Sequence, residues 1–290
     1  MMMNKLYKQL VVLFIIGLTS QACAAKQVKS QQSDTAKVAY NIRYAQKPDS
    51  IGADTSADRT LDLHLPAIKA GQKVPVLVLI HGGGFSGGDK KSTGAIAAAL
   101  TKYGYAVVNI NYRLALKRKK IAGASASANM AAGLPANGFH PALSNAVNIA
   151  SQDAQLALQW IKDNARLYHF DLTKIAIGGG SAGAMTSLYT AYVSQQKVLQ
   201  IGAVVNLWGG LEKVELITKN SPPVITFHGD QDKLINVSYA QAIQKRKEDL
   251  GDRSSILEVM QGKGHARYDI ILKEKIPSIA AFLKKTFAVK

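Results

Sequence analysis

The chain has 290 residues, enough for one large α/β domain or two small domains. Hydrophobic residues make up 47% of it, an ordinary share for a globular protein and ample for a buried core. The formal net charge of +17 favours anionic surfaces and ligands as partners.

The N-terminal residues have the pattern of a secretory signal peptide. Lys5 and Lys8 precede an apolar run at residues 10–18, and an A-x-A pattern follows at residues 22–24. The apolar run is too short for a membrane-spanning helix, which needs about 20 such residues. We therefore predict a signal peptide at residues 1–24 and export to the periplasm or the medium.

The only cysteine, Cys23, lies at this predicted cleavage site. Cleavage after residue 24 or 25 leaves a mature protein without a thiol, which excludes disulfides, thiol catalysis and zinc–cysteine sites. The alternative is a lipoprotein anchored at a lipidated Cys23. We favour soluble export, because Ser20 stands where a bacterial lipobox usually has leucine.

Short strands begin after a polar linker, so residues 25–58 are expected to hold the linker and the first strand. Two segments alternate between apolar and polar residues, as strands with one exposed face do. Another is continuously apolar, which is typical of a strand buried on both faces of a parallel sheet. The alternating segments are residues 37–44 and 59–66, and the continuous one is residues 74–81.

Helices and strands then alternate to the end of the chain, which predicts a mostly parallel sheet covered on both faces. The total is about eight strands in one α/β domain at residues 59–290. The helices are expected near residues 92–103, 145–167, from 182, 237–250 and 271–287. The strands are expected near residues 105–113, 174–178, 201–207, 223–228 and 256–261.

Residues 115–144 show no clear periodicity and are rich in small residues. Long loops in compact domains are usually functional or disordered. This segment leaves the sheet edge at which active sites of such folds lie. It is either a lid or acyl-pocket wall, or a surface loop.

A basic cluster at residues 117–120 lies within this segment. It lacks the interleaved aromatic residues that nucleic-acid binding favours, and the chain is predicted to be exported. We expect a solvated basic face and no nucleic-acid partner. An acidic polymer or an anionic envelope surface remains an alternative partner.

A glycine-rich loop follows the apolar strand, with the sequence HGGGFSGGDKK at residues 81–91. Such a loop can cradle phosphates, and this one nearly matches a P-loop. It can also hold the oxyanion of a tetrahedral intermediate, as HGGG loops of lipases do. The loop alone does not decide between the two.

A candidate nucleophile lies in the sequence GGSAG at residues 179–183, which matches G-x-S-x-G. The match is informative because a buried strand precedes Ser181 and a helix follows it. A sharp turn there lifts the hydroxyl above the sheet and places the Ala182 N–H at the start of the helix.

A serine hydroxyl needs a base, and the base needs an acid that orients it. His265 lies on a loop between the last strand and the last helix, at the same sheet edge as Ser181. Asp230 and Asp232 both follow the penultimate predicted strand. Either can orient the histidine, and either can instead cap the next helix. We favour Asp232.

These motifs in this order resemble α/β-hydrolases of the carboxylesterase group, near hormone-sensitive-lipase-like and acetyl-xylan or feruloyl-type esterases. The resemblance spans most of the chain from Leu61 onward and rests on residues 81–85, 111–114, 179–183, 228–232 and 264–265. It implies the α/β-hydrolase fold and supports Asp232 as the acid. Many relatives have Asp or Glu before the serine, where this chain has Gly180, and residues 115–144 are longer than expected.

The resemblance favours the oxyanion interpretation of the glycine loop. Asp89 separates Gly88 from Lys90 and breaks the P-loop pattern. The N–H groups of Gly83, Gly84 and Ala182 are the predicted oxyanion hole.

The predicted function is an exported serine carboxylesterase that cleaves short-chain or small aromatic-acid esters, free or linked to a polymer. Ser181, His265 and Asp232 form the predicted triad, and no cofactor or metal is expected. Amide or peptide cleavage by the same triad is the first alternative. A non-catalytic binding protein on a hydrolase fold is the second.

Overall fold

The computed structural model describes residues 35–118, 121–134 and 138–288. The predicted signal peptide, Cys23 and most of the linker lie outside these residues, as do Lys119 and Lys120. Among the described residues, no helix is both long and apolar enough to span a bilayer.

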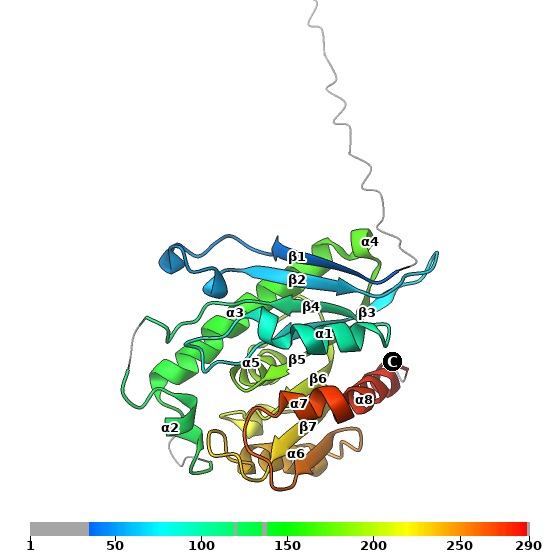
Figure 1. Cartoon of the computed structure of the whole chain (residues 1–290). Coiled ribbons are helices and arrows are strands. Elements are labelled where there is room, and N and C mark those ends of the chain that lie inside the picture. Colours follow the sequence, from blue (N-terminus) through cyan, green and yellow to red (C-terminus); the bar gives the residue numbers. More distant parts are fainter. Residues whose placement is uncertain (1–34, 119–120, 135–137, 289–290) are drawn as a thin grey trace, which may run out of the picture.

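Eight strands of the described chain form one sheet, in the order β1-β2-β4-β3-β5-β6-β7-β8 (Figure 1). The strands β1 and β2 pair antiparallel, as do β2 and β4, and all other neighbours are parallel. The predicted mostly parallel sheet is thus confirmed. The strands are β1 Lys37–Arg43, β2 Thr60–Leu65, β3 Val74–Ile80, β4 Ala106–Ile110, β5 Phe170–Gly180, β6 Ile201–Leu207, β7 Val224–Gly229 and β8 Ile256–Met260.

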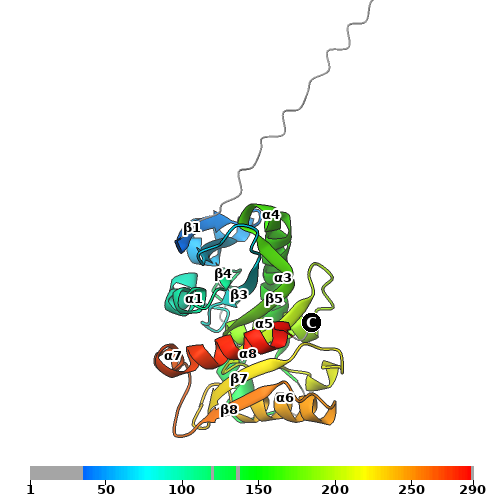
Figure 2. The same ribbon diagram turned by 90° about the vertical axis from the view of Figure 1, so that its right-hand side faces the viewer.

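Helices cover both faces of the sheet, and Figure 2 shows α1 on one side and α3 on the other. One hydrophobic cluster lies between the sheet and α1 and α8, and the other lies between the sheet and α3, α5 and α6. The helices are α1 Gly94–Thr101, α2 Ala126–Met130, α3 Pro141–Asp163, α4 Ala165–Tyr168, α5 Ala182–Tyr192, α6 Ser238–Asp249, α7 Tyr268–Ile270 and α8 Ile276–Ala288.

The continuously apolar strand β3 lies inside the sheet, between β4 and β5, with its side chains buried apart from Pro75. Parallel strands covered by helices on both faces need apolar side chains on both sides, which explains the absence of alternation. The carboxyl ends of β3, β5, β7 and β8 meet at one edge. In open α/β sheets this edge is where ligands bind.

The long helix α3 begins at Pro141, four residues earlier than the periodicity indicated. The side chain of His140 caps it by accepting a hydrogen bond from the Ala142 N–H at 3.1 Å. Proline at the first helical position is pre-organised for a helix start. The cap and the proline therefore set this boundary rather than the apolar pattern.

The segment at residues 115–144 contains the short helix α2, whose first turn is capped by Ser125. Its basic cluster is partly tied to the preceding chain. Lys117 pairs with Asp54 at 2.7 Å, and Arg118 donates to the carbonyl of Ile51. Both residues are nevertheless exposed, so the solvated basic face stays a prediction.

A buried ion pair joins the glycine loop to the edge of the sheet. The ammonium of Lys90, only 2% exposed, lies 3.1 Å from Asp62 of β2 and 2.8 Å from the Asn41 side-chain oxygen. Asp62 also accepts the Asn41 N–H at 2.9 Å, where β1 bulges away from regular pairing. A lysine buried this deeply requires an anionic partner.

Removing that partner should destabilise the fold. The substitution Asp62→Ala leaves the charge of Lys90 buried without compensation, which costs about 3–5 kcal/mol of unfolding free energy. Urea denaturation at pH 7 measures the loss. The matched control is Asp249→Ala, which breaks the exposed pair with Lys245 and should change stability by less than about 1 kcal/mol. Equal effects of the two variants would contradict the role of burial.

Candidate active site

Ser181 lies at the turn where β5 passes into α5. Its backbone has φ of 54° and ψ of −120°, a strained conformation for a residue with a side chain. The flanking chain approaches β3 so closely that a Cβ atom at Gly179 or Gly183 would lie 2.2 or 2.1 Å from the carbonyl oxygen of Ile80. Glycine at both positions permits this turn, which raises the Ser181 hydroxyl at the carboxyl edge of the sheet.

A chain of hydrogen bonds joins the three predicted site residues. The Ser181 hydroxyl lies 2.9 Å from Nε2 of His265, and Nδ1 of His265 lies 2.6 Å from Oδ2 of Asp232. With the Nδ1 proton donated to the carboxylate, Nε2 is free to accept the serine proton. The structure thus brings together residues that are far apart in the sequence.

The carboxylate of Asp232 is buried and held from several sides. Its Oδ1 accepts the backbone N–H groups of Leu234 and Ile235 at 2.9 and 3.0 Å. Burial alone would raise the pKa of Asp232, but hydrogen bonds from His228, His265 and these N–H groups hold the pKa well below its usual value. The group is therefore a fixed anion beside His265.

His228 is a site residue whose contact with the acid the sequence reasoning missed. Its Nε2 lies 2.8 Å from the carbonyl oxygen of Ile235 and 3.2 Å from Oδ2 of Asp232, and its side chain is fully buried. The imidazole therefore links the carboxylate to the turn that carries it. The sequence signal was the motif at residues 228–232, in which His228 ends a buried strand four residues before Asp232.

The other candidate acid, Asp230, is placed differently. Its Oδ1 is buried without a hydrogen-bond partner in the described structure, and no hydrogen bond joins Asp230 to His265 there. Of the two aspartates, the geometry brings only Asp232 to the histidine.

A cavity of about 470 Å³ opens over Ser181 and is lined by the glycine loop, His265, Tyr268 and the start of α2. Its size falls within the range of small-molecule sites. Among the described residues that line it, none is acidic and none is Lys or Arg. The cavity therefore suits an uncharged ligand.

Gly83 and Gly84 line this cavity together with Ser181. The loop folds back on itself, because the N–H of Gly87 donates to the carbonyl of Gly83 at 3.0 Å. Ala182 is the first residue of α5, so its N–H has no partner within the helix. Among the described residues, the N–H groups of all three have no hydrogen-bond acceptor.

No group of three or more His, Cys, Asp or Glu side chains could hold a metal ion in the described part of the chain. The hydrogen-bonded chain and the cavity support the chemistry of a serine made nucleophilic by an oriented imidazole, next to unpaired N–H donors.

Esterases are among the solved structures with the same architecture. A truncated carbohydrate esterase from gut microbiota superposes with a TM-score of 0.64 at 16% identity, covering 89% of this chain and 99% of that one. The propionate-bound esterase 2 of Thermogutta terrifontis gives 0.62 at 19% identity, covering 87% and 94%. The chain has the α/β-hydrolase fold. The fold that the sequence motifs predicted is thereby confirmed.

Sequence comparison finds similarity to esterases. The family model described as BD-FAE matches residues 61–131 and 141–207. Fumonisin B1 esterase of Sphingopyxis macrogoltabida is 31% identical over 139 residues, which are 44% of this chain and 22% of that protein. The chain thus spans only about a fifth of that relative's length. The predicted resemblance to esterases is confirmed.

The pKa of Asp232 predicts how stability changes with pH. A carboxyl whose folded-state pKa lies below its unfolded-state value stabilises the fold above that unfolded value, about 4, and the contribution is lost as pH falls through the folded pKa. The substitution Asp232→Asn should therefore lower the unfolding free energy at pH 7, and the difference from wild type should shrink progressively below about pH 4. Chemical denaturation across this pH range measures both.

The control for this effect is Asp230→Asn, which removes a carboxylate two residues away whose buried Oδ1 has no partner in the described structure. It should not show the same loss at neutral pH. If the unfolding free energy of the two variants depended on pH in the same way, the stabilisation of ionised Asp232 by its hydrogen bonds would be disproved.

Proposed function

We propose that this protein is a serine carboxylesterase that acts through an acyl-enzyme intermediate. The observation that carries the proposal is the hydrogen-bonded chain from Ser181 through His265 to Asp232, which opens into a cavity. The names of the related proteins, among them a fumonisin esterase and a carbohydrate esterase, support the same reaction class.

In the first half of the proposed reaction, Ser181 Oγ attacks the ester carbonyl carbon while His265 Nε2 takes the serine proton. The carbonyl oxygen becomes an oxyanion, which the N–H groups of Gly83, Gly84 and Ala182 stabilise. His265 then returns the proton to the alcohol oxygen, which leaves, and the acyl group stays on Ser181.

In the second half, a water molecule attacks the acyl carbon. His265 takes a proton from the water and returns it to Ser181 Oγ, which releases the acid and restores the enzyme. Asp232 stays ionised throughout, because its hydrogen bonds favour the charged form. Its role is to fix the tautomer of His265 and to stabilise the imidazolium.

The proposed substrates are neutral esters of short acyl chains or small aromatic acids. The cavity of about 470 Å³ has room for a small ester. Among the described residues that line it, there is no Asp, Glu, Lys or Arg. A structural neighbour is described with propionate bound, which agrees with a short acyl group.

We also propose that the protein acts outside the cytoplasm. The basic start, the apolar run at residues 10–18 and the small residues up to 24 support export. Ester-linked polymers and anionic envelope surfaces are then within its reach. The alternative is anchoring through a lipidated Cys23. The mass of the N-terminal peptide of the mature protein would distinguish this from cleavage after residue 24 or 25.

Hydrolysis of p-nitrophenyl esters from acetate to palmitate tests the proposed reaction. Wild-type activity should peak at short acyl chains, because the cavity limits their length. The substitution Ser181→Ala removes the nucleophile and should abolish nearly all turnover, leaving the melting temperature close to that of wild type. Equal activity of the two proteins, or no activity of wild type on any ester, would overturn the triad interpretation.

The glycine loop allows a matched test of the oxyanion hole. A Cβ atom at Gly83 would lie 2.1 Å from the carbonyl oxygen of Gly87, and its φ of 118° disfavours a side chain. The substitution Gly83→Ala should displace the N–H donors and lower kcat by about 10²–10³.

The control lies in the same loop. A Cβ atom at Gly87 would meet no atom within 4 Å, so Gly87→Ala should keep kcat within about threefold of wild type. Comparable losses in both variants would contradict the assignment of the donors to Gly83 and Gly84.

A further inference from the structure

Gly180, the residue before the nucleophile, has no side chain, and the space is filled by another residue. A Cβ atom at Gly180 would lie 2.3 Å from the hydroxyl oxygen of Tyr268 and 3.0 Å from its Cζ. A contact of 2.3 Å is essentially never seen for a real Cβ atom, so any side chain at position 180 must displace the tyrosine hydroxyl, whereas the contact with Cζ needs only a small shift. The hydroxyl of Tyr268 thus lies directly against the turn that carries Ser181.

Tyr268 is held firmly in this place. It begins α7, and its ring packs edge to face on Trp208 with centroids 4.9 Å apart and planes at 90°. Trp208 in turn lies edge to face with the ring of His265 at 6.4 Å. The Tyr268 hydroxyl also lies beside Gly82, 3.5 Å from where a Cβ atom of that residue would stand.

The Tyr268 hydroxyl is protonated at neutral pH, and its proton is available for a hydrogen bond. Burial raises the pKa of Tyr268 to about 12, although the nearby Gly82 backbone partly opposes this. Among the described residues no acceptor receives the phenol proton, and Tyr268 lines the same cavity as Ser181 and His265.

We infer that Tyr268 is a further catalytic residue, whose hydroxyl donates a hydrogen bond to an oxygen of the ester bound at Ser181. The absence of a side chain at Gly180 is what makes room for this donor. The inference rests on the proposed esterase function and adds to it a contact that the triad and the oxyanion hole do not provide.

The substitution Tyr268→Phe isolates the hydroxyl, because the phenyl ring keeps the packing on Trp208. It should lower kcat/KM for p-nitrophenyl esters about tenfold, as the loss of one hydrogen bond in the transition state does. The loss should be uniform from pH 6 to 9, because the pKa of Tyr268 lies above this range. The shape of the pH profile should therefore match that of wild type.

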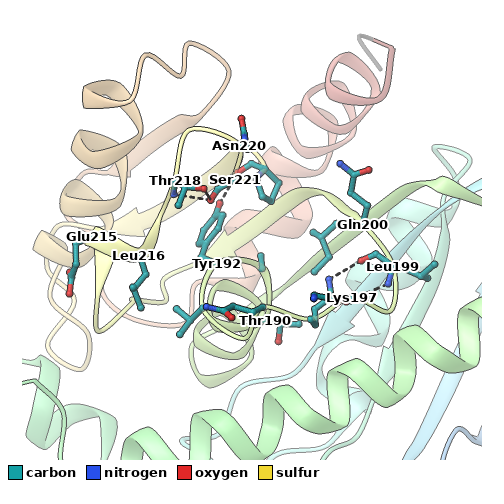
Figure 3. A pocket seen from close by; sticks show the side chains of 16 residues that line it. Thr190, Tyr192, Lys197, Leu199, Gln200, Glu215, Leu216, Thr218, Asn220 and Ser221 are labelled. Carbon is teal, nitrogen blue, oxygen red and sulfur yellow. Dashed lines mark hydrogen bonds between the residues drawn. The ribbon is translucent and has the colours of Figure 1, made fainter.

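The matched control is Tyr192→Phe. The Tyr192 hydroxyl donates to the carbonyl of Pro222 at 3.0 Å, so this variant also loses one buried tyrosine hydrogen bond. Tyr192 lines a different cavity of about 700 Å³, at the amino ends of β6 and β7 (Figure 3). Its kcat/KM should equal that of wild type.

A double-mutant cycle with Gly180→Ala tests the coupling between the two residues. With Tyr268 present, the added methyl group displaces the hydroxyl, so Gly180→Ala should cost at least as much as Tyr268→Phe. In the Tyr268→Phe background the hydroxyl is already gone, and the same substitution should cost less than about threefold.

Wild-type kcat/KM in Tyr268→Phe, additive losses in the cycle, or an equal loss in Tyr192→Phe would each overturn the inference. The outcome is separate from that of the proposed function. If wild type hydrolyses esters and Ser181→Ala does not, the esterase proposal stands whether or not Tyr268→Phe is impaired.

Discussion

The close approach of β3 and β5 at the carboxyl edge of the sheet is the constraint on which the site depends. The carbonyl of Ile80 lies so near the turn after β5 that only glycine fits at positions 179 and 183. This contact forces the strained backbone of Ser181 and starts α5 immediately behind it. It also brings the glycine loop that follows β3 beside the nucleophile, so hydroxyl and N–H donors share one cavity.

A second constraint is the burial of charge around that cavity. Asp232 is buried, yet its carboxylate is held ionised by two histidines and two backbone N–H groups. On the other side of the loop, Lys90 is buried and held by Asp62. Each buried charge has a partner within hydrogen-bond distance, and among the described residues no Asp, Glu, Lys or Arg side chain lines the cavity. The proposed neutral ester would meet fixed dipoles there rather than mobile ions, and fixed dipoles stabilise a developing oxyanion.

The sequence alone was sufficient for the sheet and for the order of its strands and helices. Continuous apolar runs such as residues 74–80 are typical of buried strands, and the glycines around Ser181 indicate a turn in which a side chain would clash. Ser181, Asp232 and His265 each follow a strand, and the carboxyl ends of these strands meet at one edge of the sheet. The alternation of strands and helices was therefore enough to predict that the three residues lie at the same edge.

What the sequence could not supply were contacts between side chains from distant elements. Nothing in the pattern around His228 indicates that its Nε2 reaches Asp232, because that depends on how the turn after β7 folds. Tyr268 is adjacent to Gly180 only in three dimensions. The pairing of Lys90 with Asp62 crosses from the glycine loop to β2, and a lysine in such a loop is ordinarily exposed. The start of α3 depended on a histidine cap, which weak apolar periodicity cannot reveal.

Covalent labelling of the nucleophile is the decisive measurement. A structural neighbour, esterase 2 of Thermogutta terrifontis, is described as phosphorylated by paraoxon. Wild-type protein treated with paraoxon should gain one diethyl phosphoryl group by intact mass, and peptide mapping should place it on Ser181. Ser181→Ala should gain none. A labelled serine elsewhere, such as Ser86, or no adduct under conditions in which esters are hydrolysed, would contradict the assignment of Ser181 as the nucleophile.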